Sequence, residues 1–212
     1  MVDQGDNLEA ISTQNPRKVT KSPHVLSAVI NRRSTGRLKE PGPGKAELES
    51  IIKAAISAPD HGRLRPWRFV VFQGEARDRF GIILADALRC RLESEGHTPT
   101  ELMMSKERNK LLRAPCVIAV GAAIDRDSHI PVIEQFGATA AACENMLIAA
   151  TALGLGSMWR TGDPSYDNSV KVALGLRETD MIAGWIYLGS VEEPPSARAF
   201  GGDVEQYVSH WK

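Results

Sequence analysis

Apolar residues recur every three or four positions along several stretches of the chain, which is the spacing of an amphipathic helix. Ser22 followed by Pro23 predicts the start of a first helix that ends near Asn31, because serine caps helices and proline suits the first turn. Besides a long central helix, four further helices are predicted: between Gly44 and Pro59, over residues 75–95, around residues 102–104 and over residues 164–174.

Other stretches have the length and composition of β-strands. They lie at residues 67–72, 116–124 and 181–188, with a short one around Met158 and Trp159. Residues 116–124 are apolar almost without interruption, which predicts a strand covered on both faces. The alternation of helices and strands, without an internal repeat or linker, predicts a single α/β-layered domain.

The longest predicted helix covers residues 131–153 and is apolar on nearly every side. It should therefore be buried on all sides. In a chain of 212 residues, a helix without a solvent-exposed polar face indicates a subunit interface. The apolar run over residues 136–159 has the length of a membrane span. However, Glu144 and Asn145 lie at its middle, and it is rich in alanine and glycine, so we interpret it as a buried helix.

Composition excludes several classes of function. Lysine plus arginine and aspartate plus glutamate number 26 each, so the chain lacks the basic excess that a general nucleic-acid binder needs. The three cysteines are far apart, which excludes a disulfide framework and a zinc-binding pair. Residues 1–20 are polar, unlike a secretory signal, and we expect a cytoplasmic protein without a membrane partner.

We expect three regions along the chain. Residues 1–21 are predicted to be a flexible tail, residues 22–212 a single domain, and residues 192–212 a proline- and glycine-rich arm at its end.

The glycine cluster at residues 154–159 could suggest dinucleotide binding. The third glycine position is Trp159, and the cluster follows a helix and opens a strand, so a helix C-cap is the better interpretation. No phosphate-binding loop, nucleophile elbow or two-histidine zinc helix occurs in the sequence, and we expect no metal.

Three polar turns carry cations: Arg32 and Arg33 with Ser34, then Arg63 and Arg65, then Arg160–Gly162. Guanidinium groups, hydroxyls and free backbone amides suit a phosphate monoester. Each turn alone is better interpreted as a solvated surface feature, and only the combination of the three indicates binding. Among the histidines, only His61 lies in a loop rich in polar and basic residues, where function often resides.

Four motifs occur in order along the chain. They are Asn31-Arg32-Arg33-Ser34, Ala58-Pro59-Asp60-His61 running on to Arg65-Pro66-Trp67-Arg68-Phe69, Glu134-Gln135 at the start of the long helix, and Gly154-Leu155-Gly156-Ser157-Met158-Trp159-Arg160-Thr161-Gly162. Together they resemble the nitroreductase family, and more narrowly its small bacterial YdjA-like subgroup. The resemblance extends from about Val25 to Gly189.

This resemblance implies an α+β three-layer sandwich with a mostly antiparallel central sheet flanked by helices, and a long buried central helix at a homodimer interface. It implies FMN as cofactor, NADH or NADPH as co-substrate, and small-molecule acceptors such as nitroaromatics or quinones, reduced in a two-step exchange. The flavin carries the chemistry, so no dedicated catalytic residue is required.

The resemblance also assigns residues to the flavin. Arg32, Arg33 and Ser34 match the segment that holds the FMN phosphate and ribityl chain, and Arg160, Thr161 and Gly162 match a later flavin-binding turn. His61 and Ser57 match the loop that reaches the flavin from the other subunit. Arg65 is a departure, since many relatives carry glutamine there.

Two alternatives remain at this level. The protein could bind flavin without turnover, as a carrier or sensor, or it could catalyse a specialised flavin reaction such as reductive dehalogenation. The segment over residues 97–112, with Met103 and Met104, is either a cover over the flavin or a satellite helix.

Overall fold

The computed structural model describes residues 22–193 and 203–212. The chain divides into two compact units, Met1–Asn31 and Arg32–Lys212. The predicted tail and residues 194–202 of the predicted arm lie outside the described residues, and a single domain over residues 22–212 stays a prediction. In the first unit, helix α1 (Pro23–Asn31) has the predicted bounds, and its last residue donates a hydrogen bond from Asn31 Nδ2 to Ser27 Oγ at 3.0 Å.

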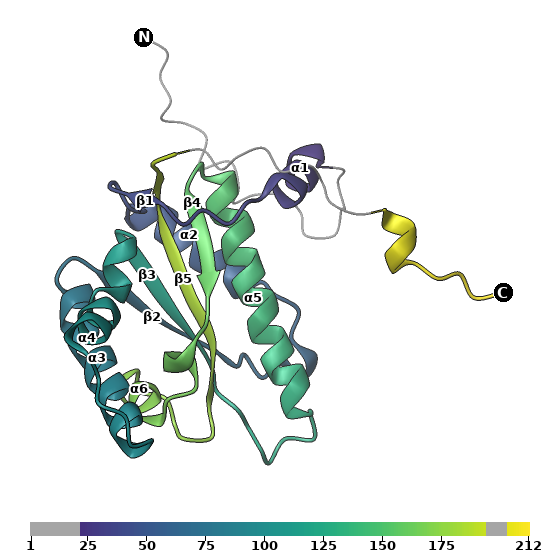
Figure 1. Cartoon of the computed structure of the whole chain (residues 1–212). Coiled ribbons are helices and arrows are strands. Elements are labelled where there is room, and N and C mark those ends of the chain that lie inside the picture. Colours follow the sequence, from purple (N-terminus) through teal and green to yellow (C-terminus); the bar gives the residue numbers. More distant parts are fainter. Residues whose placement is uncertain (1–21, 194–202) are drawn as a thin grey trace, which may run out of the picture. The chain divides into compact units, whose positions relative to one another are not determined.

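A five-stranded sheet forms the centre of the second unit (Figure 1). Its strands are β1 (Leu38–Lys39), β2 (Trp67–Gln73), β3 (Cys116–Ala122), β4 (Gly156–Arg160) and β5 (Met181–Val191). The order is β1-β5-β3-β2, β4 also pairs with β5, and every one of these pairs is antiparallel.

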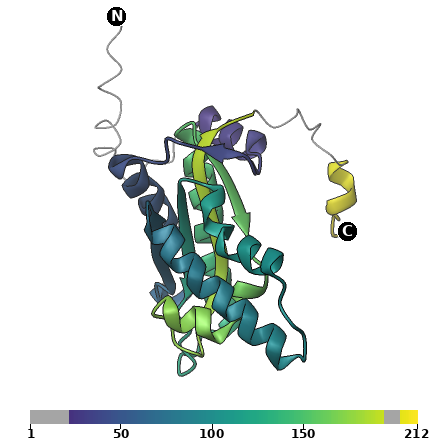
Figure 2. The same cartoon turned by 60° about the vertical axis from the view of Figure 1, so that its left-hand side comes forward.

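Helices cover both faces of this sheet. On one face lie α2 (Lys45–Ala55) and α5 (Val132–Ala152), and on the other lie α3 (Ala76–Ser94), α4 (Glu101–Arg108) and α6 (Asn168–Ala173), as Figures 1 and 2 show. Short 3-10 helices lie in the connections, namely η2 (His61–Arg63), η3 (Lys110–Arg113) and η4 (Asp163–Ser165), and a fourth, η5 (Val204–Tyr207), follows β5. The predicted α+β three-layer sandwich is confirmed.

Each face of the sheet has its own apolar core. The α5-side core includes Ile51, Ile118, Cys143, Met146 and Leu188. The α3-side core includes Phe72, Phe80, Leu84, Trp185 and Tyr187. All seven residues of β3 are buried, with Ile118 in one core and Val117 in the other, so the predicted coverage on both faces is confirmed.

One prediction about helices needs correction. The helix expected over residues 164–174 is interrupted, because the Asp167 carboxylate accepts hydrogen bonds from the amides of Ser169 and Val170 and starts α6 afresh at Asn168. Within the single chain α5 leaves Ile133, 74% exposed, and Gly137 uncovered, so its burial on all sides by a second subunit stays a prediction. Among the described helices, none combines the length and apolar character that a bilayer crossing requires.

Candidate functional site

The segment Arg32–Ser34 lies against the edge strand β4. Ser34 forms an isolated parallel bridge with Ser157, and the Thr35 amide donates to the Ser157 carbonyl at 2.8 Å. The Arg33 guanidinium also donates to the Arg32 carbonyl at 2.8 Å. The fold thus brings the first predicted cationic turn beside the strand that ends at Arg160, in the third predicted turn.

Two polar atoms beside this contact are buried and lack a hydrogen-bond partner among the described residues. They are Arg32 Nη1 and Ser157 Oγ. The other side of the Arg32 guanidinium is paired, since its Nε lies 3.2 Å from Glu144 Oε1 on α5. A buried donor without a partner costs on the order of 1–3 kcal/mol, so a bound polar ligand would relieve this cost. The donor set of guanidinium and hydroxyl suits the phosphate and ribityl groups of FMN.

The turn after β4 is fixed from both sides of the sheet. Trp159 Nε1 donates to the Ala183 carbonyl at 3.0 Å, and the Arg160 guanidinium lies 5.9 Å from the centre of the Tyr187 ring. Gly184 makes the close approach of Trp159 possible, because a Cβ at that position would lie 2.2 Å from Trp159 Nε1. The backbone of Gly162, with φ of 109°, turns sharply after Arg160 and Thr161.

A cavity of about 530 Å³, called here the α4 cavity, opens beside this turn. Residues of α3, α4, η3, β5 and the turn line it: Leu88, Met103, Lys106, Glu107, Lys110, Arg113, Arg160, Thr161, Gly162, Trp185 and Tyr187. The segment over residues 97–112, predicted to be either a flavin cover or a satellite helix, therefore contributes one wall of a cavity that also contains the predicted flavin-binding turn.

Ser57 and His61 lie on other elements of the chain. Ser57 follows α2, and its hydroxyl donates to the Lys53 carbonyl at 2.8 Å. His61, 64% exposed at its side chain, lies in η2 with Nδ1 2.5 Å from Glu134 Oε2 at the start of α5. Both residues therefore belong to the α2–α5 side of the sheet, whereas Arg160–Gly162 line the α4 cavity.

The loop that carries His61 has an unusual backbone. Arg63 and Arg65 both have positive φ, 55° and 50°, which residues other than glycine adopt at a cost of about 1–2 kcal/mol. The Asp60 carboxylate compensates in part by accepting a hydrogen bond from the Arg65 amide at 2.7 Å. Strained backbone of this kind clusters at functional sites.

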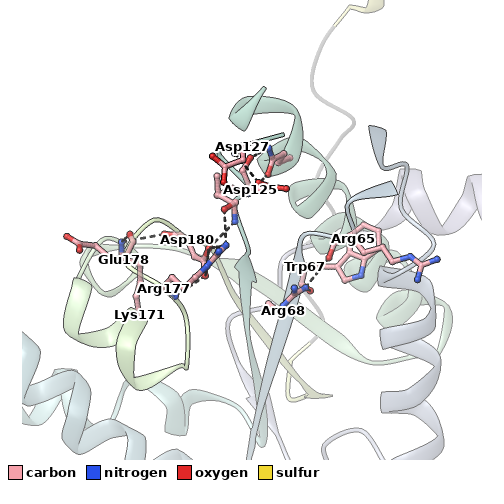
Figure 3. Close-up of polar contacts among 11 residues, drawn as sticks. Arg65, Trp67, Arg68, Asp125, Asp127, Lys171, Arg177, Glu178 and Asp180 are labelled. Carbon is pink, nitrogen blue, oxygen red and sulfur yellow. Dashed lines mark hydrogen bonds and ion pairs between the residues drawn. The ribbon is translucent and has the colours of Figure 1, made fainter. Parts of the chain in front are cut away.

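A polar cluster around Arg177 and Asp180 holds the segment just before β5 in place (Figure 3). The buried Asp180 carboxylate accepts hydrogen bonds from the Arg177 guanidinium at 2.8 Å and from the Ile124 amide at 3.0 Å. Burial alone would raise the pKa of Asp180, but hydrogen bonds from Arg177 and from the backbone hold this pKa below its ordinary value.

Titration behaviour also narrows the candidate chemistry. Burial raises the pKa of the Cys116 and Cys143 thiols to about 12, so neither is a candidate nucleophile. Burial also raises the pKa of Tyr187 to about 12, although the charges of Arg113 and Arg160 act in the opposite direction. Within the described residues, no group of three or more histidine, cysteine, aspartate or glutamate side chains is placed to hold a metal ion.

Sequence reasoning did not single out Ser157, Glu144, Tyr187 or the cations of α4 and η3. Ser157 lies inside a quoted motif, but a serine in an edge strand gives no signal of its own. Tyr187 has the pattern of a core strand residue, and the cations of α4 have the pattern of a solvated helix face.

The nitroreductase family model matches residues 29–190. YdjA of Escherichia coli (strain K12), provisionally named as an NAD(P)H nitroreductase, is 35% identical over 188 residues, which cover 88% of this chain and 99% of that protein. The chain belongs to the nitroreductase family, and the predicted likeness to the YdjA-like subgroup is confirmed.

Solved structures agree on the fold. A nitroreductase-like family protein from Bacillus cereus superposes with a TM-score of 0.75 at 22% identity, covering 92% of this chain and 100% of that one. A provisionally named nitroreductase from Desulfovibrio desulfuricans, solved in complex with FMN, gives a TM-score of 0.66 at 25% identity, covering 91% and 99%.

Proposed function

We propose that this chain is an FMN-containing, NAD(P)H-dependent oxidoreductase that reduces nitroaromatic, quinone or related acceptors in a two-step exchange. The observation that carries the proposal is the contact of Arg32–Ser34 with β4, where Arg32 Nη1 and Ser157 Oγ are buried without partners. Family membership, the name of YdjA and the FMN complex of the Desulfovibrio protein support it.

The residues divide the binding task. Arg32, Arg33 and Ser34 offer guanidinium and hydroxyl donors to the FMN phosphate and ribityl chain, and Arg160–Gly162 offer a rigid turn to the ring system. FMN, when bound, supplies hydride acceptance from NAD(P)H and donation of reducing equivalents to the acceptor. The chain itself binds and orients its ligands, and it needs no dedicated catalytic residue.

A homodimer belongs to this proposal. Ser57 and His61 lie on the α2–α5 side, from which they would reach the flavin of the partner subunit. The exposed face of α5 around Ile133 and Gly137 supports such an interface, because a cofactor between subunits needs a large permanent contact. Three free cysteines accord with the reducing cytoplasm proposed as its location.

The first test is the absorption spectrum of the purified protein, with identification of the cofactor released by heat. Flavin bands and released FMN are expected. A colourless protein that also takes up no added FMN would overturn the proposal. Stopped-flow mixing with NADH and with NADPH then tests turnover: rapid bleaching of the flavin is expected, and inert flavin would leave only a flavin-binding protein.

The phosphate assignment has its own test. The double variant Arg32→Ala with Arg33→Ala should weaken FMN binding by about tenfold or more, because it removes charge-assisted hydrogen bonds. Arg79→Ala, exposed on α3, is the matched control and should bind FMN normally. Unchanged FMN affinity in the double variant would refute the assignment, provided that its circular dichroism spectrum and melting temperature show a folded protein.

A further inference from the structure

The α4 cavity carries a marked excess of positive charge. Lys106, Lys110, Arg113 and Arg160 line it with a single acid, Glu107, so four positive charges face one negative charge and three remain. The whole chain has no net charge, with 26 basic and 26 acidic residues. A cavity lined by one sign of charge raises the local concentration of ligands of the opposite sign.

Of the three cations outside the predicted flavin-binding turn, two have no ion-pair partner among the described residues. Lys110 is engaged by an ion pair and hydrogen bond with the buried Glu107 carboxylate. Lys106 and Arg113, in contrast, have no ion-pair partner within the part of the chain that the structure describes. Arg113 lies close enough to Tyr187 for its charge to lower the pKa of that phenol.

The remaining lining suits a flat apolar ring. Leu88, Met103 and Trp185 supply apolar surface. Tyr187 also lines the cavity and is only 3% exposed. Its hydroxyl has no hydrogen-bond partner among the described residues, so it is free to bond to a ligand. A few polar groups converging on an apolar cavity are the usual features of a small-molecule site.

We propose that the α4 cavity is an anion-selective substrate site that favours aromatic acceptors carrying a carboxylate or phosphate, with Lys106 and Arg113 determining this specificity. The inference rests on the proposed function, since the cavity shares Arg160–Gly162 with the proposed flavin site. The same anionic chemistry could also come from the additional phosphate of NADPH, and the experiment below separates the two sources.

The test uses the FMN-loaded protein and two acceptors of similar size, 4-nitrobenzoate and the neutral 4-nitrobenzyl alcohol. With NADH as reductant, the ratio of their kcat/KM values should fall about tenfold in Lys106→Gln and in Arg113→Gln, mainly through KM, since each removes a charge-assisted contact. Arg113→Lys should recover part of the ratio. Arg79→Gln, on the exposed surface of α3, should leave it unchanged.

A binding measurement accompanies the kinetics. Titration of benzoate into the oxidised protein should perturb the flavin absorption band, and the Gln variants should need about tenfold more benzoate. Comparison of NADPH with NADH forms the third arm. If the Gln variants change only the ratio of kcat/KM for NADPH to that for NADH, the cavity binds an anion, and this anion is the additional phosphate of NADPH.

The outcomes distinguish this inference from the function on which it rests. Variants that keep FMN and turnover, but show unchanged acceptor ratios, unchanged benzoate affinity and unchanged NADPH preference, would overturn the anion-selective site alone. Absence of FMN from the unmodified protein would overturn the proposed function itself.

Discussion

The cores on the two faces of the sheet differ in side-chain type and in what lies beside them. The α5-side core is mainly aliphatic, and Ile51, Ala142, Met146 and Leu188 are fully buried. The α3-side core is rich in rings, with Phe72 and Phe80 centred 4.7 Å apart, and Trp185 and Tyr187 of this core also line the α4 cavity. The core on the α5 side of the sheet is therefore closed, whereas the core on the α3 side has the α4 cavity at its edge.

This difference has a physical reason. Small aliphatic side chains fill the space between a helix and a sheet at high density, so the α5 side leaves little room for a ligand. On the other face, Trp185 and Tyr187 of the core border the α4 cavity together with long cationic side chains from α4 and η3. The core on the α5 side is thus closed, whereas the core on the α3 side borders the α4 cavity.

The largest expected effect tests the closed core. Met146→Ala should lower the free energy of unfolding by about 2–5 kcal/mol, because a fully buried side chain is replaced by a void. Leu102→Ala, at an exposed position on α4, is the control. Urea unfolding measures both. A loss for Met146→Ala no larger than that of the control would contradict a closed core on the α5 side.

A smaller effect is expected where α3 contacts α4. A Cβ on Gly81 would lie 2.0 Å from the Arg108 carbonyl oxygen, so Gly81→Ala must push the two helices apart, at a cost of about 1–3 kcal/mol. Since α4 forms a wall of the α4 cavity, benzoate affinity should change as well, whereas Met146→Ala should leave it unaltered. Arg89→Ala on the exposed surface of α3 is the control, and equal benzoate affinity in all three variants would refute the coupling.

The smallest effect concerns Asp180 at the start of β5. Asp180→Asn should cost about 1–2 kcal/mol at neutral pH, because a charged acceptor of buried hydrogen bonds is replaced by a neutral one. The folded-state pKa of Asp180 is depressed, so its stabilisation is present above the unfolded pKa of about 3.9 and is lost as pH falls through the folded pKa. The stability difference between the unmodified protein and Asp180→Asn should therefore be constant above about pH 5 and shrink below about pH 4. A gap that widens in acid would disprove this account.

Much of the fold was predictable because hydrophobic periodicity is a local property. The bounds of α3 and the burial of β3 follow from the spacing of apolar residues, and those of α1 also from Ser22 and Pro23 at its start. Strand β1 was missed because its two residues, Leu38 and Lys39, are too few to show the alternation of apolar and polar side chains that marks a strand. The break between η4 and α6 was missed because Asp167, within an otherwise helical pattern, caps a new helix through its side chain.

For the site, the sequence itself determined the four family motifs and hence the candidate flavin-binding residues: Arg32–Ser34, Ser57, His61 and Arg160–Gly162. Only the tertiary structure decided that Arg32–Ser34 meet β4 at Ser157, and that cations of α4 and η3 face Tyr187 across a cavity. Such contacts join residues more than 70 positions apart: an isolated parallel bridge joins Ser34 to Ser157, and β3, which follows η3, pairs with the strand that carries Tyr187. A local pattern records which face of an element is apolar, but not which other element that face will meet.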